Sequence, residues 1–201
     1  MSSGPISITR NFWTQLVSKI AMVRTISVCM LAALSGAACM AQTPRTLDVE
    51  AQRTAMKKLG FLVGDWSGEA PVLRGPGQLA ELAQTESAQF RLDGLVLVIE
   101  GVGRTKADGK LSLQALGLIS FDDETGSYKM RAFNDGRWLE TDVKLADGAK
   151  SISWGFALGE FKTTTVLSIN ENGEWTEHGV LVSGDHPPQK MMELTVRRSS
   201  R

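Results

Sequence analysis

Acidic side chains are the residues best suited to proton chemistry in this chain, because paired carboxyls can hold or transfer a proton. Four of them lie in segments that we expect to be strands: Glu100, Glu140, Asp142 and Glu177. Glu140 and Asp142 are two residues apart, so in a strand they point to one face, together with Trp138. If that face is inward, repulsion raises one pKa and marks a functional pair. If it is outward, the two carboxylates are solvated surface charges.

A second group of side chains could border a binding cavity. We expect ligand contacts from aromatic and arginine residues on strands: Tyr128, Arg131, Trp138 and Trp154. Small residues at other strand positions leave interior room if they face inward: Gly101, Ala115, Gly117, Ala132, Ser151, Ser153, Thr163 and Thr165. If they face outward instead, side chains fill the interior and no ligand fits. The pattern predicts binding of a small, largely apolar ligand, with a purely structural protein as the alternative.

Other chemistries lack the residues that they need. The chain contains no Gly-x-Ser-x-Gly motif and no glycine-rich phosphate loop ahead of a helix, so a conventional hydrolase or nucleotide enzyme is not expected. Its 22 basic residues balance 22 acidic ones, which disfavours binding to nucleic acid. With only 2 Cys and 2 His, a multi-cysteine zinc site is excluded.

Short alternating segments separated by turn signals must position these residues. Pairs such as Asp93-Gly94 and Asn172-Gly173 supply the positive φ of tight hairpins, and the connections are too short for parallel crossovers. Closing such an antiparallel meander removes both exposed edges. The sequence therefore predicts an all-β, up-and-down barrel over residues 60–201. Its strands are expected at approximately 65–73, 84–91, 95–104, 111–121, 127–134, 137–144, 150–156, 160–169, 174–182 and 189–197.

A linker and a short amphipathic helix are expected ahead of the barrel, within residues 42–59. Asp48 can cap the helix and Gly60 can end it. Its apolar face consists of Ala51, Ala55, Met56 and Leu59.

Three segments carry a resemblance to a known family: Phe61-Leu62-Val63-Gly64-Asp65-Trp66-Ser67-Gly68-Glu69, Gly173-Glu174-Trp175-Thr176-Glu177-His178-Gly179 with Ser183-Gly184-Asp185, and Met191-Met192-Glu193-Leu194-Thr195-Val196-Arg197-Arg198. The first resembles the start of calycin-like barrels, including lipocalins and nitrobindins. All three together resemble the bacterial domain-of-unknown-function family 1579, over about residues 56–198. The resemblance implies a calycin-like barrel and no settled activity.

The resemblance also implies roles for particular residues. In related barrels an arginine of the last strand stacks on the first tryptophan, so Arg197 is expected to stack on Trp66 and close the barrel. Nitrobindins hold haem iron through a late histidine, which makes His178 the candidate ligand in an alternative, haem-binding function. His186 precedes two prolines in a turn and is expected to be exposed. The leading interpretation needs no cofactor.

The first 41 residues have the composition of an export signal. They contain no Asp or Glu, and an apolar run with small residues at its end follows a few cations. We expect cleavage before Gln42 or, alternatively, lipidation of Cys39. A membrane is expected to be contacted only through the leader or a lipidated Cys39. The expected protein is exported, periplasmic or secreted. A lipid-anchored or structural envelope protein without a ligand remains the third interpretation.

Overall fold

The computed structural model describes residues 46–75, 78–134 and 136–199 of the chain. The predicted leader, 1–41, lies outside the described residues, as do Cys39 and Gln42. Within the part that is described, no helix is long and apolar enough to span a membrane.

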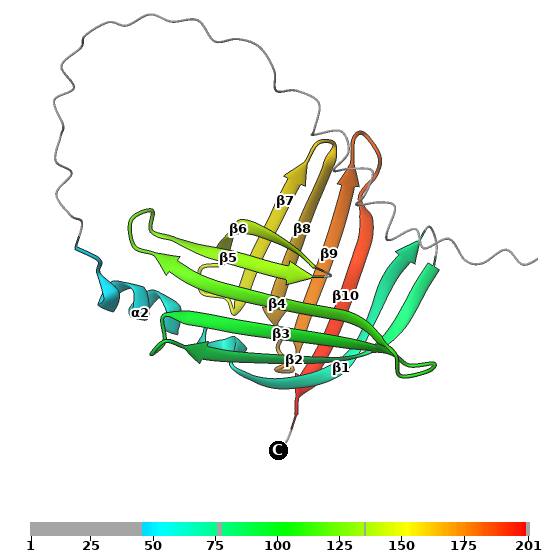
Figure 1. Cartoon of the computed structure of the whole chain (residues 1–201), viewed down its shortest axis with the longest axis horizontal. Coiled ribbons are helices and arrows are strands. Elements are labelled where there is room, and N and C mark those ends of the chain that lie inside the picture. The colour runs from blue at the N-terminus through cyan, green and yellow to red at the C-terminus, as the bar shows by residue number, and fades with distance from the viewer. Residues whose placement is uncertain (1–45, 76–77, 135, 200–201) are drawn as a thin grey trace, which may run out of the picture. The chain divides into compact units, whose positions relative to one another are not determined.

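Ten antiparallel strands form one closed barrel (Figure 1). Each strand pairs with its neighbours in the chain, and β1 closes the barrel by pairing with β10, for example Trp66 with Arg198. The predicted all-β, up-and-down barrel is confirmed. The strands are β1 Gly64–Gly75, β2 Gln78–Arg91, β3 Val96–Thr105, β4 Leu111–Asp122, β5 Ser127–Asn134, β6 Arg137–Leu145, β7 Ser151–Leu158, β8 Phe161–Ile169, β9 Trp175–Ser183 and β10 Gln189–Arg198.

Strand β2 begins earlier than the sequence pattern predicts. The pattern places its start at residue 84, but β2 runs from Gln78, and its first residues pair with the end of β1. The segment Gln78–Gln84 is rich in Ala, Leu, Glu and Gln, which favour helix over strand. Pairing with β1 overrides that local preference.

A short helix covers one end of the barrel. Helix α2 (Val49–Lys57) precedes the 3₁₀ turn η1 (Gly60–Leu62), and Asp48 caps α2 by accepting a hydrogen bond from Ala51 N at 2.9 Å. The Tyr128 hydroxyl donates to the carbonyl of Ala55 at 2.7 Å, which ties the helix to β5. Because α2 is fixed in this way, the interior on its side is closed.

The interior next to the helix is a packed apolar core. Alternation sends every second residue inward, and those nearest α2 have almost no exposed surface. They include Leu97, Ile119, Val143, Ile152, Leu167, Trp175 and Val196. On β4 to β10, several apolar side chains that point inward further from the helix are only half-buried, although Thr163 and Thr165 between them are buried. The half-buried ones are Leu113, Ala132, Trp154, Phe156, Phe161, Leu181 and Met192. The barrel is therefore filled at the helix end and more open towards the other.

Trp66 anchors the closed end, with an arginine partner that differs from the predicted one. Its indole N–H donates to Leu62 O at 2.9 Å, and its ring meets Trp175 edge-on at 5.5 Å. The guanidinium over its ring, at 4.2 Å, belongs to Arg198. The prediction of Arg197 was wrong because residue 197 points outward in the register of β10, where it pairs with Glu174.

One junction of the barrel is much shorter than the others. Among the described residues, β6 and β7 pair only through Lys144 with Ser153 and Leu145 with Ile152, both next to their connecting turn. Beyond that, the Thr141 hydroxyl donates to Gly155 O at 2.6 Å. The strands then diverge towards the rim (Figure 1).

Candidate functional site inside the barrel

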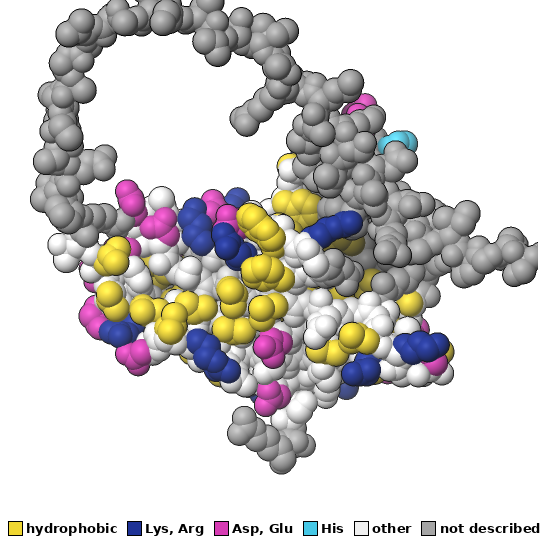
Figure 2. Space-filling model, in the orientation of Figure 1, with side chains coloured by type: hydrophobic (Ala, Val, Ile, Leu, Met, Phe, Trp, Pro, Cys, Tyr) yellow, Lys and Arg dark blue, Asp and Glu magenta, His cyan; other side chains and the backbone are white. Residues whose placement is uncertain are grey.

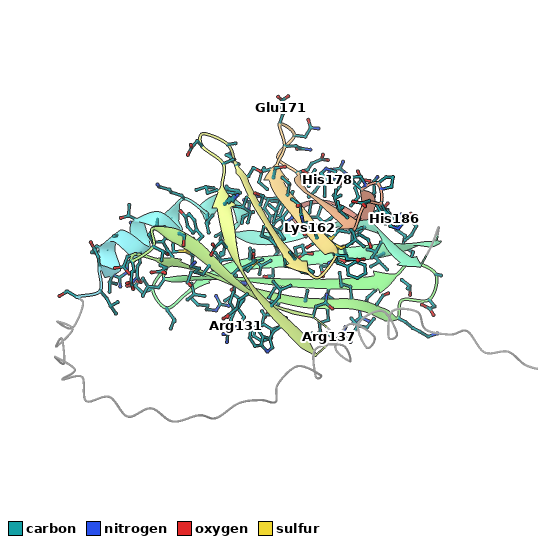
Figure 3. All side chains as sticks on the ribbon, turned by 90° about the horizontal axis from the view of Figure 1, so that it is seen from above. Arg131, Arg137, Lys162, Glu171, His178 and His186 are labelled. Carbon is teal, nitrogen blue, oxygen red and sulfur yellow. The ribbon has the colours of Figure 1, made fainter. Side chains whose placement is uncertain are left out.

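The four residues predicted to contact a ligand separate into two inward and two outward positions. Tyr128 and Trp154 face inward, but the Tyr128 hydroxyl is occupied by the helix. Arg131 and Trp138 face outward and stack on one another, with the guanidinium 4.8 Å from the ring centre. Figure 3 shows Arg131 on the outer side of the β5–β6 hairpin. Of the four, only Trp154 is placed to meet a molecule in the interior.

The carboxylate pair on β6 is on the outer surface. Glu140 accepts from Arg131 Nε at 2.7 Å, and Asp142 forms an ion pair of 2.6 Å with Lys129. Both are cross-strand pairs of exposed side chains. The outward interpretation of Glu140 and Asp142 is confirmed, and their charges are balanced by β5.

Neither histidine reaches the interior. His178 faces outward on β9 with 54% of its side chain exposed, and its Nδ1 lies 3.6 Å from Glu193 Oε1. His186 is exposed in the turn before β10. Figure 3 shows both on the side of the molecule that β9 and β10 form. An interior haem needs an inward imidazole, so the His178 prediction is wrong and these residues do not fit that group. Nor does any cluster of three or more His, Cys, Asp or Glu suited to a metal ion occur in the described chain.

Most of the small residues that could create interior room do face inward. They are Gly101, Ala115, Gly117, Ala132, Thr163 and Thr165, whereas Ser151 and Ser153 face outward. At Gly117, an added Cβ would have only ordinary contacts, the closest being Ile99 Cβ at 3.8 Å. The middle of the barrel is thus lined by short side chains.

The middle of the barrel also carries a polar cluster, which we call the carboxyl cluster: Gln84, Glu86, Trp175 and Glu177. Gln84 is 2% and Glu86 9% exposed, and Gln84 Nε2 donates to Glu86 Oε1 at 2.7 Å. Glycines on β3 make room for both side chains. A Cβ at Gly101 would lie 2.8 Å from Glu86 Oε2, and one at Gly103 would lie 2.5 Å from Gln84 Oε1.

Burial dominates the electrostatics of both acids. It raises the pKa of Glu86 to about 8, with a further increase from the charge of Glu177 and a partial decrease from the Gln84 hydrogen bond. Burial likewise raises the pKa of Glu177 to about 7, which the Trp175 indole partly offsets. Near neutral pH the pair therefore holds at least one proton.

Two polar atoms of the carboxyl cluster are left without a partner. They are the carbonyl oxygen of Gln84, Oε1, and the indole nitrogen of Trp175, Nε1. The indole influences the Glu177 carboxyl but forms no hydrogen bond with it. Most buried polar side-chain atoms in proteins have a partner, and an unpaired one costs about 1–3 kcal/mol. An acceptor and a donor thus remain available inside the barrel.

Gln84 and Glu86 are not among the predicted site residues. They lie at the start of the strand expected at 84–91. Because that expected strand omits residues 78–83, too few residues remain to show clearly which of its two faces is apolar. A signal for an inward direction is nevertheless present, because Leu82, Ala88 and Phe90 lie on the same face of the strand as Gln84 and Glu86. An acid on the same strand face as three apolar residues is expected to point inward. Glu177 is one of the predicted strand carboxylates, but the mixed composition of both faces leaves its direction undecided.

A groove on the outer surface is the other candidate site. It has a volume of about 630 Å³ and runs across β3 to β6, between Val96, Leu118, Lys129, Arg131 and Asp142. Figure 2 shows hydrophobic side chains gathered over this face. The charges at the groove are already paired with one another across β5 and β6. The interior, where polar atoms are unpaired, therefore has the stronger claim.

Comparisons with known proteins bear on the fold alone. No family model matches the chain, and neither does any curated protein sequence. Among solved structures, the crystal structure of Rv2717c from M. tuberculosis is similar, with a TM-score of 0.55 and 15% sequence identity. The match covers 73% of this chain and 98% of that one.

Proposed function

We propose that this protein binds a small, largely apolar molecule inside its barrel, with the polar end of the molecule at the carboxyl cluster. The observation that carries the proposal is the unpaired Gln84 Oε1 and Trp175 Nε1 beside two interior acids. A protein whose barrel serves only as a scaffold gains nothing from such groups, since an apolar core is more stable than a half-satisfied polar one.

Inward aromatic side chains elsewhere in the barrel support an apolar body for the ligand. Trp154 and Phe156 on β7 and Phe161 on β8 face inward and keep part of their surface accessible. Apolar walls with a few fixed polar groups are typical of small-molecule sites. We expect this body to lie along the short residues on β4 and β5, where an added Cβ at Gly117 would meet no atom closer than 3.8 Å.

Filling that space is expected to abolish binding. Gly117→Leu adds a branched side chain to the inward face of β4, where an added Cβ has room. Gln114→Leu, which is outward and exposed on the same strand, is the matched control. Intrinsic tryptophan fluorescence, titrated with a series of alkyl and aromatic compounds, measures the affinity. We expect the wild type and Gln114→Leu to bind equally, and Gly117→Leu to lose about tenfold or more.

Equal affinities for Gly117→Leu and the wild type would place the ligand outside the interior. If no compound changes the emission of the wild-type protein, the binding proposal is wrong and a structural role is favoured.

We further propose that the protein is exported. The support is the acid-free, apolar composition of residues 1–41. N-terminal sequencing of the protein recovered from its host is expected to begin at Gln42, or to be blocked at a lipidated Cys39. A chain that begins at Met1 in the cytoplasm would refute export but leave the binding proposal untouched.

A further inference from the structure

The two interior acids face the same space without a counter-charge. Glu86 comes from β2 and Glu177 from β9, and they are close enough for the charge of Glu177 to act on Glu86. Within the described residues, neither carboxyl forms an ion pair with a lysine, arginine or histidine, and the ion pairs of this part of the chain lie elsewhere. Glu86 is buried and Glu177 is partly buried, and carboxylates in such positions are normally paired.

Two arginines also lie at inward-facing strand positions, but neither is available to the acids. One is bonded to other groups and the other lies at the rim. Arg198 donates to Val63 O at 2.6 Å and to Phe61 O at 3.2 Å, and it stacks on Trp66. Arg137 is exposed at the rim, where β6 begins. Tyr128, a further inward titratable group, donates to the helix. On β1, β3 and β10, the strands next to β2 and β9, the other inward side chains that the structure describes are uncharged. The same holds for β8.

Once both acids are ionised, the free hydrogen-bonding capacity at this point is mainly that of acceptors. Gln84 donates one of its two amide N–H groups to Glu86, and its Oε1 has no partner. Ionised carboxylates accept only, so Glu86 and Glu177 add further acceptor sites. The group that matches them has several N–H donors, no acceptor and a positive charge. An ammonium has these properties.

We propose that the polar end of the ligand is an organic ammonium group, bound between Glu86 and Glu177 with Gln84 Oε1 as a third acceptor. This inference rests on the proposed function and names the ligand class. The Trp175 indole, which lowers the pKa of Glu177, then favours the ionised form of that carboxyl. An alkanoate would be repelled by the same acids.

Binding of the cation must release protons. In the empty protein the raised pKa values keep the pair partly protonated, whereas the bound ammonium favours both carboxylates in their ionised form. Each carboxyl that ionises gives its proton to solvent while the amine keeps its own. Because protons compete with the ammonium, its affinity increases with pH between about 6 and about 8, and the affinity of an uncharged ligand does not.

The test compares octylammonium, octanol and octanoate, which share one alkyl chain, by isothermal titration calorimetry on the full chain. We expect octylammonium to bind about tenfold tighter than octanol at about pH 8, to lose several-fold at about pH 6, and to release protons detectable in buffers of different ionisation enthalpy. Octanoate is expected to bind most weakly.

Variants separate the acids from the apolar walls. Glu86→Gln and Glu177→Gln each keep the shape of the side chain and are expected to weaken octylammonium about tenfold while leaving octanol unchanged. Glu100→Gln, on the outer face of β3, is the matched control and should bind like the wild type. If octanol binds as tightly as octylammonium, or if the variants do not distinguish them, the ammonium inference is wrong but the proposal of interior binding is retained. If none of the three compounds binds, both proposals fail.

Discussion

Replacing Trp66 with alanine is expected to lower the free energy of unfolding by about 3–5 kcal/mol, the usual cost of emptying a large aromatic site in a core. Trp66 is 1% exposed and packs edge-on against Trp175. Its indole also donates to Leu62 O, so the substitution leaves a carbonyl unpaired under the helix. Urea denaturation followed by circular dichroism measures the change.

Substituting Arg198, the arginine stacked on Trp66, tests the same contact from the other side. Arg198→Ala should cost less than Trp66→Ala, and the two losses should not add, because the guanidinium loses its ring when Trp66 is absent. Arg197→Ala is the matched control: it is the adjacent residue, it faces outward, and its surface ion pair is worth at most about 1 kcal/mol. Strict additivity of Trp66→Ala and Arg198→Ala would remove the stacking claim.

The free energy of unfolding is expected to fall as the pH increases from about 5 to about 8. In the folded protein, burial raises the pKa of Glu86 to about 8 and that of Glu177 to about 7, from 4.5. Unfolding restores the ordinary values, so in this window the unfolded chain binds fewer protons than the folded one. The stability is then complete below about pH 4.5 and is lost as the pH passes the folded values. A tenfold change in an acid's ionisation constant corresponds to about 1.4 kcal/mol, so the two acids together change the stability by several kcal/mol.

Uncharged variants assign this slope to particular residues. Glu86→Gln should remove the decrease above about pH 7 and about half of the decrease below it, and Glu177→Gln should remove about half of the decrease below about pH 7. The double variant should remove most of the decrease. Glu100→Gln, which is exposed on the outer face, should leave the profile unchanged. Denaturation curves at a series of pH values measure these slopes. A double variant with the wild-type profile would show that other groups are responsible.

The fold was predictable because the sequence contains a recognisable signal for most of its turns. Glycines at the ends of Asp-Gly and Asn-Gly pairs, such as Gly94 and Gly173, adopt the positive φ that tight turns require. Short connections between alternating segments then leave an antiparallel meander as the simplest arrangement. Closure followed from the number of strands and the need to pair their edges.

The site was less predictable, because it depends on which face of each strand points inward. In β10, Leu194 and Val196 are buried, and the same parity makes residue 198, not 197, the partner of Trp66. In β9, the apolar and polar residues are divided between both faces, so the direction of Glu177 required the register with β8 and β10. Glu86 follows a segment whose local composition does not favour strand, which shortens the alternation that would reveal its direction.

Neighbouring strands of the barrel are not joined by equal numbers of hydrogen bonds. At the junction of β6 and β7, backbone pairing among the described residues stops after two residue pairs, and the Thr141 hydroxyl adds one side-chain link beyond them. Local opening of a protein costs least where the fewest hydrogen bonds must break. Fluctuations therefore separate the β5–β6 and β7–β8 hairpins at the rim before they disturb any other junction, and they do so beside Trp154. A molecule in the interior can leave by that route while the rest of the barrel stays folded. For the ligand that we propose, the residence time would then be governed by this junction, and the affinity by Glu86 and Glu177.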